Sequence, residues 1–175
     1  MSPENDPSWL VEPLNDNHNR AAFSCDNEAL DHYLKERASQ DARRYVAAPF
    51  VLVDKSAPNI ILGYYTLSAF GVDAGELPAK ISKKLPRYPI IPATLIGGLA
   101  VDHRHRGKSI GEALLMDALR RALEQSFHIA SVAVIVDAID EPAARFYERY
   151  EFVPFPDKPN RLFLLMKTIA ALFGD

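Results

Sequence analysis

The stretch from Leu99 to Leu115 constrains the fold and the chemistry of this chain more than any other. It runs from an apolar segment, Leu-Ala-Val, through a basic turn, into the start of an amphipathic helix. Backbone N–H groups at such a turn attract anions, and the positive end of the helix dipole adds to the attraction. Arg104, Arg106 and Lys108 add positive charge around the turn. The sequence therefore predicts a site for a phosphate-bearing cofactor.

Length and composition indicate a soluble globular protein. The chain has 175 residues, of which 48% are hydrophobic and 25% charged, and this predicts one domain over residues 1–175 with a loose N-terminus at 1–8. No apolar run approaches the roughly 20 residues that span a bilayer, and no secretory signal is present. Cys25 is the single cysteine, which excludes an intrachain disulfide. The histidines show no metal-ligand spacing beyond the weak pair His103 and His105. We expect a cytoplasmic protein without metal or membrane contacts.

Positive charge is concentrated in one part of an otherwise acidic chain. The net charge is −3, yet residues 79–108 hold seven lysines or arginines and a single acid, Asp102. Such a patch suits a polyanionic ligand bound at one place. Two interpretations stay open: a solvated loop beside a cofactor-phosphate site, or an extended RNA-binding surface.

Hydrophobic periodicity predicts a mixed α/β sheet flanked by helices. A helix is expected from an Asp26 cap to about Arg43 or Arg44, another with Gly111 in its first turn, and a third capped by Asp140. Residues 71–92 form a basic, proline-containing insert with a short helix near residues 80–85. Strands are expected at residues 9–14, 50–54, 59–68, 94–101, 130–136, 152–155 and 161–166.

The order of four motifs resembles the Gcn5-related N-acetyltransferase (GNAT) family. These motifs are Gly98–Asp102, the basic loop, Gly111–Leu115 and residues 143–152. The resemblance implies a mixed, mostly antiparallel sheet that splays between strands 99–101 and 130–136. It also implies acetyl-CoA as cosubstrate, with the pyrophosphate on the loop amides and the pantetheine arm on the main chain of the preceding strand. The implied cofactor-binding residues are Leu99, Ala100, Val101, Arg106, Gly107, Lys108, Ser109, Ile110 and Gly111.

Two positions differ from the family pattern in that motif region. Ser109 stands where the family usually has its first glycine, and Glu151 replaces the usual glycine before Phe152. Ser109 can still offer its N–H to a phosphate unless the turn needs a positive φ at this position. Only glycine adopts a positive φ at little cost.

Tyr147 is the residue that the resemblance assigns to catalysis, as the acid that protonates the departing coenzyme A thiolate. A phenol with a pKa near ~10 can donate a proton to a thiolate of similar basicity. Its helical spacing with Phe146 and Tyr150 also fits an ordinary aromatic core position. No catalytic carboxylate stands out; Asp102 and the neighbouring histidines are weak candidates for a base. An acceptor with an α-amino group needs no such base, because its pKa of ~8 leaves it partly neutral at the pH of the cell.

The N-terminal half resembles the acetyltransferase toxins of bacterial type II toxin–antitoxin modules. The resemblance rests on residues 23–34, 63–68 and 89–92, with Asp26 in place of a usual glycine. It implies acetylation of the α-amino group of aminoacyl-tRNA, inhibition of translation and a ribbon-helix-helix antitoxin; a homodimer is left open. The basic residues expected to meet tRNA phosphates are Lys80, Lys83, Lys84, Arg87, Arg43 and Arg44. Two alternatives remain: acetylation of a small amine or protein N-terminus, and a non-catalytic coenzyme A-binding or interaction module.

Overall fold

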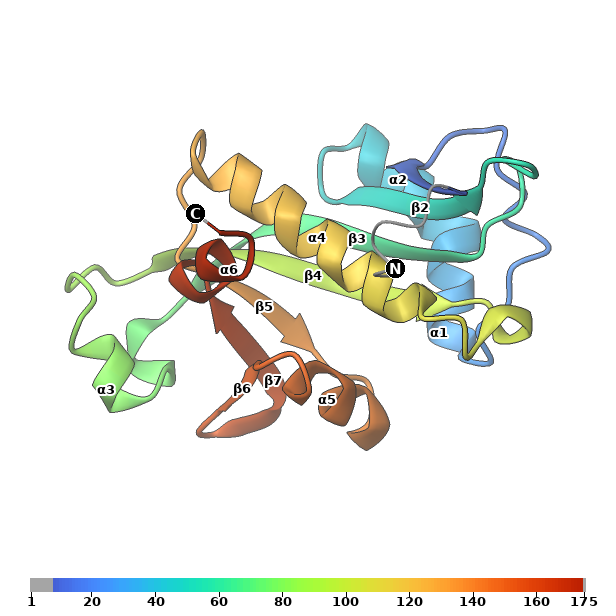
Figure 1. The fold of residues 1–175 in the computed structure, drawn as a ribbon. Helices are drawn as coiled ribbons and strands as arrows, with labels where there is room; N and C mark the ends of the chain where they lie inside the picture. The colour runs from blue at the N-terminus through green and yellow to red at the C-terminus, as the bar shows by residue number, and fades with distance from the viewer. Residues whose placement is uncertain (1–7, 175) are drawn as a thin grey trace. The chain divides into compact units, whose positions relative to one another are not determined.

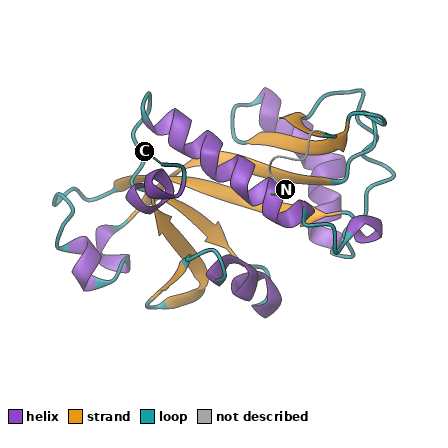
Figure 2. Ribbon diagram, in the orientation of Figure 1, coloured by secondary structure: helices purple, strands orange, loops and turns teal. Residues whose placement is uncertain are grey.

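In the part of the chain that the structure describes, seven strands form one sheet, in the order β1-β2-β3-β4-β5-β7-β6 (Figure 1). A computed structural model describes residues 8–174, so the loose N-terminus predicted for residues 1–8 lies outside them apart from Ser8. The β4–β5 pair is parallel, whereas the pairs β1–β2, β2–β3, β5–β7 and β6–β7 are antiparallel. The predicted mixed, mostly antiparallel sheet with helices is therefore confirmed (Figure 2).

The described residues divide into two compact units. One comprises residues 8–68 and 97–118, and the other residues 69–96 and 119–174. Strands β3 and β4 and helix α4 each contribute residues to both units, because the chain crosses between the units within these elements. That residues 1–175 form a single domain stays a prediction.

The first unit combines a strand hairpin with a long helical run. Its strands are β1 (Trp9–Pro13), β2 (Ala48–Asp54) and the first part of β3 (Gly63–Val72). Its helices are α1 (Glu28–His32), a π-helical turn (Tyr33–Arg37), α2 (Ala38–Arg43) and the first part of α4 (Ile110–Ser126). The predicted hairpin is confirmed, since Phe50 pairs with Tyr65 in antiparallel register.

The first helix has a different N-cap from the one that the sequence predicts. Asn27, not Asp26, is the N-cap: its φ of −127° is extended and its side chain accepts a hydrogen bond from Leu30 N. Asp26 instead has a φ of +63°, a left-handed conformation that turns the chain into the cap. The predicted extent of the helical run, to Arg43, is confirmed.

A small aromatic cluster fills the core of the first unit. Tyr64 is fully buried, and its hydroxyl donates to the carbonyl oxygen of Leu30 at 2.7 Å. Its ring meets Phe23 edge-on at a centroid distance of 5.6 Å and stacks on Tyr33 at 6.5 Å. Because a buried tyrosine needs a partner for its hydroxyl, this bond fixes α1 against β3.

The second unit holds the other edge of the sheet and three shorter helices. Its strands are β4 (Ile91–Val101, first part), β5 (Ala133–Asp137), β6 (Val153–Phe155) and β7 (Lys158–Leu165), and its helices are α3 (Ala79–Ser82), α5 (Glu141–Glu148) and α6 (Met166–Leu172). The parallel pairing of β4 with β5 covers Thr94–Ile96 and Val134–Val136. Phe155 and Phe163 pack edge-to-face in its core.

Helix α3 confirms the short helix expected in the basic insert. Helix α6 was not predicted, because the sequence was interpreted as a strand ending at Met166. Its N-cap residue, Leu165, has no side-chain oxygen to cap the helix, so the local signal of a helix start is missing. Among residues 8–174, no helix is long and apolar enough to cross a membrane.

Candidate active site

The loop that joins β4 to α4 has the predicted strand–turn–helix form. Strand β4 ends at Val101, Asp102 caps a single 3-10 turn, and α4 begins at Ile110. The carbonyl oxygen of Ser109 accepts the first bond of the helix, from Ala113 N at 3.1 Å. The first N–H groups of a helix lack partners within it, so the turn from Ser109 onward can present main-chain donors to an anion.

Two residues of this loop have left-handed backbone conformations. Gly107 has a φ of +78° and Ser109 a φ of +63°. The turn therefore does require a positive φ at the position where the family usually has glycine, and serine adopts it. For a residue with a side chain this conformation costs about 1–2 kcal/mol. The backbone path through Ser109, and with it the direction of its N–H, is nevertheless the left-handed one that glycine would take.

Both arginines of the loop bind the chain segment 22–26. Arg106 donates to the carbonyl oxygen of Cys25 at 2.7 Å and lies 3.2 Å from the Asp26 carboxylate. Arg104 donates to the carbonyl oxygen of Ala22 at 3.0 Å. These guanidinium groups thus hold the loop in place, which sequence reasoning missed because their partners lie about eighty residues away. Lys108, whose Nζ is 3.2 Å from His105 Nδ1, is the loop cation without a carboxylate partner among residues 8–174.

Asp102 is a buried structural carboxylate. It is completely buried and accepts hydrogen bonds from Ser24 N, Arg104 N and the Arg104 guanidinium. Burial alone would raise the pKa of Asp102, but the bonds from Arg104 and Ser24 outweigh it and lower the pKa to about 2. So weak a base does not serve to deprotonate an amine at neutral pH.

Tyr147 lies in the second unit, on helix α5. Asp140 caps this helix as predicted, by accepting from Ala143 N at 2.8 Å. The Tyr147 ring is 6% exposed and packs against Phe146 and Phe152 at centroid distances of 5.2 and 5.4 Å. Burial raises the pKa of its phenol, and within residues 8–174 its hydroxyl has no hydrogen-bond partner. Its position is rigid, and its proton is not committed to another side chain.

Helix α5 ends in a turn built on Glu151. This residue has a φ of +71°, and its N–H donates to the carbonyl oxygen of Glu148 at 3.1 Å. The N–H of Phe152 donates to the carbonyl oxygen of Tyr147 at 3.3 Å. This pair of bonds is the Schellman motif, in which glycine usually takes the left-handed position. The second departure from the family pattern therefore also falls where the backbone favours glycine.

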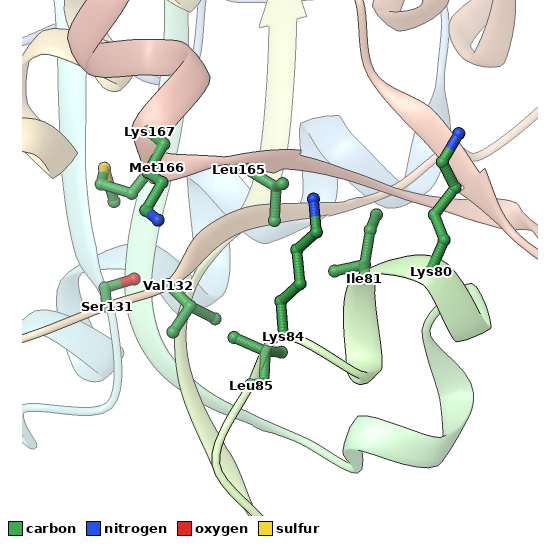
Figure 3. Close-up of a pocket in the computed structure, with 9 residues that line it drawn as sticks. All are labelled: Lys80, Ile81, Lys84, Leu85, Ser131, Val132, Leu165, Met166 and Lys167. Carbon is green, nitrogen blue, oxygen red and sulfur yellow. The ribbon is translucent and has the colours of Figure 1, made fainter.

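A pocket of about 460 Å³ opens among the basic residues of the second unit (Figure 3). Its lining combines apolar side chains with three lysines; the residues are Lys80, Ile81, Lys84, Leu85, Ser131, Val132, Leu165, Met166 and Lys167. Lys80 and Lys167 lie on opposite sides of it in Figure 3. Two of the predicted substrate residues thus come together with Lys167, which the sequence did not single out because it belongs to the unpredicted helix α6.

The other predicted substrate residues are exposed but do not line this pocket. Lys83 and Arg87 lie on the surface of the second unit, and Arg43 and Arg44 on that of the first. Within residues 8–174, no group of three or more His, Cys, Asp or Glu side chains is arranged to hold a metal ion.

Residues 11–152 match the model of the acetyltransferase (GNAT) family. The chain belongs to the GNAT family. Two relatives match this GNAT protein over nearly its whole length. A probable toxin, TacT, of Sinorhizobium fredii (strain NBRC 101917 / NGR234) is 31% identical and covers 94% of this chain and 95% of its own. A tRNA-acetylating toxin of Mycobacterium tuberculosis (strain ATCC 25618 / H37Rv) is 30% identical, with 93% and 95% covered.

Three solved structures of the toxin AtaT share this GNAT fold. AtaT in complex with acetyl-methionyl-tRNAfMet is 29% identical, with a TM-score of 0.86 and 94% of this chain and 99% of that chain covered. AtaTR bound with acetyl-CoA is 28% identical, with a TM-score of 0.83 and 95% and 98% covered. A Tyr-to-Phe mutant of AtaT bound to the C-terminus of the antitoxin AtaR is 26% identical, with a TM-score of 0.81 and 96% and 99% covered.

Proposed function

We propose that this GNAT protein transfers the acetyl group of acetyl-CoA to the α-amino group of aminoacyl-tRNA and thereby blocks translation as a toxin. The observation that carries this proposal is the likeness, over 94% of the chain, to a toxin structure that contains acetyl-methionyl-tRNA. The relative described as a tRNA-acetylating toxin supports it independently. Charged tRNA is used in the cytoplasm, and we place the reaction there.

The β4–α4 loop is the part of the chain that fits acetyl-CoA. Main-chain N–H groups from Arg106 to Gly111 would bind its pyrophosphate at the start of α4. The left-handed conformations at Gly107 and Ser109 support this role, since residues in this conformation are typical of the turns whose backbone N–H groups bind anions. The main chain of Leu99, Ala100 and Val101, at the end of β4, would bind the pantetheine arm.

Tyr147 would supply the proton that the reaction needs. The neutral amine attacks the thioester carbonyl, a C–N bond forms and the C–S bond breaks. The thiolate takes the phenolic proton, the amine nitrogen releases one proton to water, and water returns a proton to the phenolate. Burial raises the pKa of Tyr147, so the phenol carries its proton at neutral pH when the thiolate forms. No catalytic base is assigned, because an α-amino group, with a pKa of ~8, is already partly neutral at neutral pH.

The exposed cations would bind the phosphates of the RNA. Lys80, Lys84 and Lys167 surround one pocket of the second unit, and Lys83 and Arg87 lie in the same insert. Such contacts place the RNA without reading its sequence and weaken as salt concentration rises. An antitoxin is the expected protein partner, by analogy with the AtaT–AtaR complex.

The test is mass analysis of charged tRNA after incubation with the protein and acetyl-CoA. The proposal predicts a gain of one acetyl group on the amino acid and none on deacylated tRNA. Replacing Lys80 and Lys84 with Glu should abolish this modification but preserve acetyl-CoA binding. If the double variant modifies charged tRNA like the wild type, the lysines are not part of the RNA site. Acetylation of small amines with charged tRNA untouched would instead assign the protein to small-amine acetylation.

A further inference from the structure

The turn between α2 and β2 displays an aromatic residue in a left-handed backbone conformation. Tyr45 has a φ of +59°. Its N–H donates to the carbonyl oxygen of Ala42 at 3.2 Å, and the N–H of Val46 donates to that of Asp41 at 2.9 Å. These two bonds form a Schellman motif, whose left-handed position is usually glycine. The turn is therefore well defined, and its central residue is one that the backbone disfavours.

No contact among residues 8–174 accounts for an aromatic ring at this position. Tyr45 is 96% exposed, so its ring gains almost no stabilisation from burial. Glycine would relieve the backbone, and a small polar residue would avoid exposing a ring. A disfavoured residue held rigidly at the surface points to a contact outside the chain.

The charges around Tyr45 indicate which kind of ligand it contacts. Arg43 and Arg44 precede it and are both exposed, and neither has an ion-pair partner within residues 8–174. The nearest acid in the sequence, Asp41, accepts a hydrogen bond from the Tyr33 hydroxyl at 2.8 Å. The tip of the turn thus offers one flat aromatic face beside two guanidinium groups.

We propose that Tyr45 is a stacking platform for an unpaired nucleobase of the RNA substrate, with Arg43 and Arg44 on the flanking phosphates. Aromatic rings next to arginines are the usual means of holding single-stranded nucleotides, since every base has a π-face. An acidic protein segment would also meet the arginines, but a flat ring that is 96% exposed favours a base. This inference rests on the proposed function for the identity of its RNA.

The test measures the affinity of fluorescein-labelled, deacylated tRNA by fluorescence anisotropy. Tyr45→Ala should weaken binding at least about fivefold, the lower end of the loss seen when a base-stacking ring is removed. Tyr45→Phe should stay within about twofold of the wild type, because it keeps the ring. Tyr45→Gly should lose affinity like Tyr45→Ala although it suits the backbone better, which separates lost stacking from lost folding. Phe127→Ala is the matched control and should leave the affinity unchanged. Phe127 is also an exposed ring, at 72%, but its neighbours are Ser126 and His128 instead of arginines.

Wild-type affinity in Tyr45→Ala would overturn the inference, and so would an equal loss in Tyr45→Phe, which would assign the contact to the hydroxyl. The same variants are measured with a 12-nucleotide oligouridylate and, separately, for acetylation of charged tRNA. If the wild type acetylates charged tRNA and Tyr45→Ala binds RNA normally, the stacking role fails and the proposed function stands. If the wild type leaves charged tRNA unmodified but binds the oligouridylate in a Tyr45-dependent way, the proposed function fails and the stacking role stands.

Discussion

The carbonyl oxygen of Tyr147 accepts a hydrogen bond from the N–H of Phe152 at 3.3 Å, across a turn in which Glu151 has a φ of +71°. The helix that carries the proposed acid is thus closed by a residue in a conformation that favours glycine. Ser109, at the start of the proposed cofactor-binding helix, has a φ of +63°. Asp26, the third position that lacks the family's glycine, also has a φ of +63°. The chain keeps the glycine-like backbone at all three positions with other residues.

Glu151→Gly should stabilise the protein by about 0.5–1 kcal/mol. Glycine removes the cost of the left-handed conformation, about 1–2 kcal/mol, but loses part of that gain to its greater freedom in the unfolded chain. Urea unfolding followed by circular dichroism measures the difference as a higher midpoint at constant slope. A lower midpoint would mean that the Glu151 side chain itself stabilises the turn.

Ser109→Gly should raise stability by a similar amount and leave acetyl-CoA affinity within about twofold. The reason is that the proposed contact uses the main-chain N–H, which the substitution keeps. Isothermal titration calorimetry with acetyl-CoA measures the affinity. A loss of tenfold or more would show that the Ser109 hydroxyl is itself a ligand of the phosphate.

Asp102 should make the protein sensitive to acid. Its pKa is about 2 in the folded protein and about 3.9 in an unfolded chain. Since the folded pKa is the lower one, Asp102 stabilises the fold above about pH 4 and loses this contribution as the pH falls toward 2. The contribution at neutral pH is about 2–3 kcal/mol. Asp102→Asn should therefore lower stability at pH 7 and flatten its decline between pH 4 and pH 2, as measured by urea unfolding at each pH; an unchanged decline would contradict this role.

Tyr147→Phe should lower the rate of acetyl transfer by about 10²- to 10⁴-fold, the usual loss when a general acid is removed. Stability should change by less than about 1 kcal/mol, because the packing with Phe146 and Phe152 is kept and no described hydrogen bond is lost. The rate is followed by release of free coenzyme A thiol. Tyr150→Phe, in the turn that follows the same helix, is the control and should retain activity. Full activity of Tyr147→Phe would show that Tyr147 is not the acid.

Local signals in the sequence were sufficient for most of the fold. The Asp140 cap, the strand–turn–helix at residues 99–115 and the short helix of the insert each depend on neighbouring residues, and the structure confirms them. The prediction of Asp26 as the cap was wrong, because Asp26 and Asn27 both carry side-chain oxygens that can cap a helix. The decisive difference, a φ of +63° at Asp26, is set by tertiary contacts.

The sequence did not predict features that depend on contacts between residues far apart in the chain. Arg104 and Arg106 both bind segment 22–26, a contact that the sequence did not predict. Their role as charges around an anion stays a prediction. Lys167 joins Lys80 and Lys84 around one pocket although more than eighty residues separate it from either. Helix α6, which begins beside it, has no capping side chain to mark its start.

Acetylation of the amino acid carried by tRNA is the activity proposed for this GNAT protein. The direct measurement is a translating cell extract that contains the protein and acetyl-CoA, followed by mass spectrometry of the amino acids released from tRNA. We predict that translation stops and that an acetylated amino acid appears with the wild type, and that neither occurs with Tyr147→Phe at the same concentration. If the wild-type protein binds acetyl-CoA but translation continues normally and charged tRNA stays unmodified, the proposed activity is contradicted.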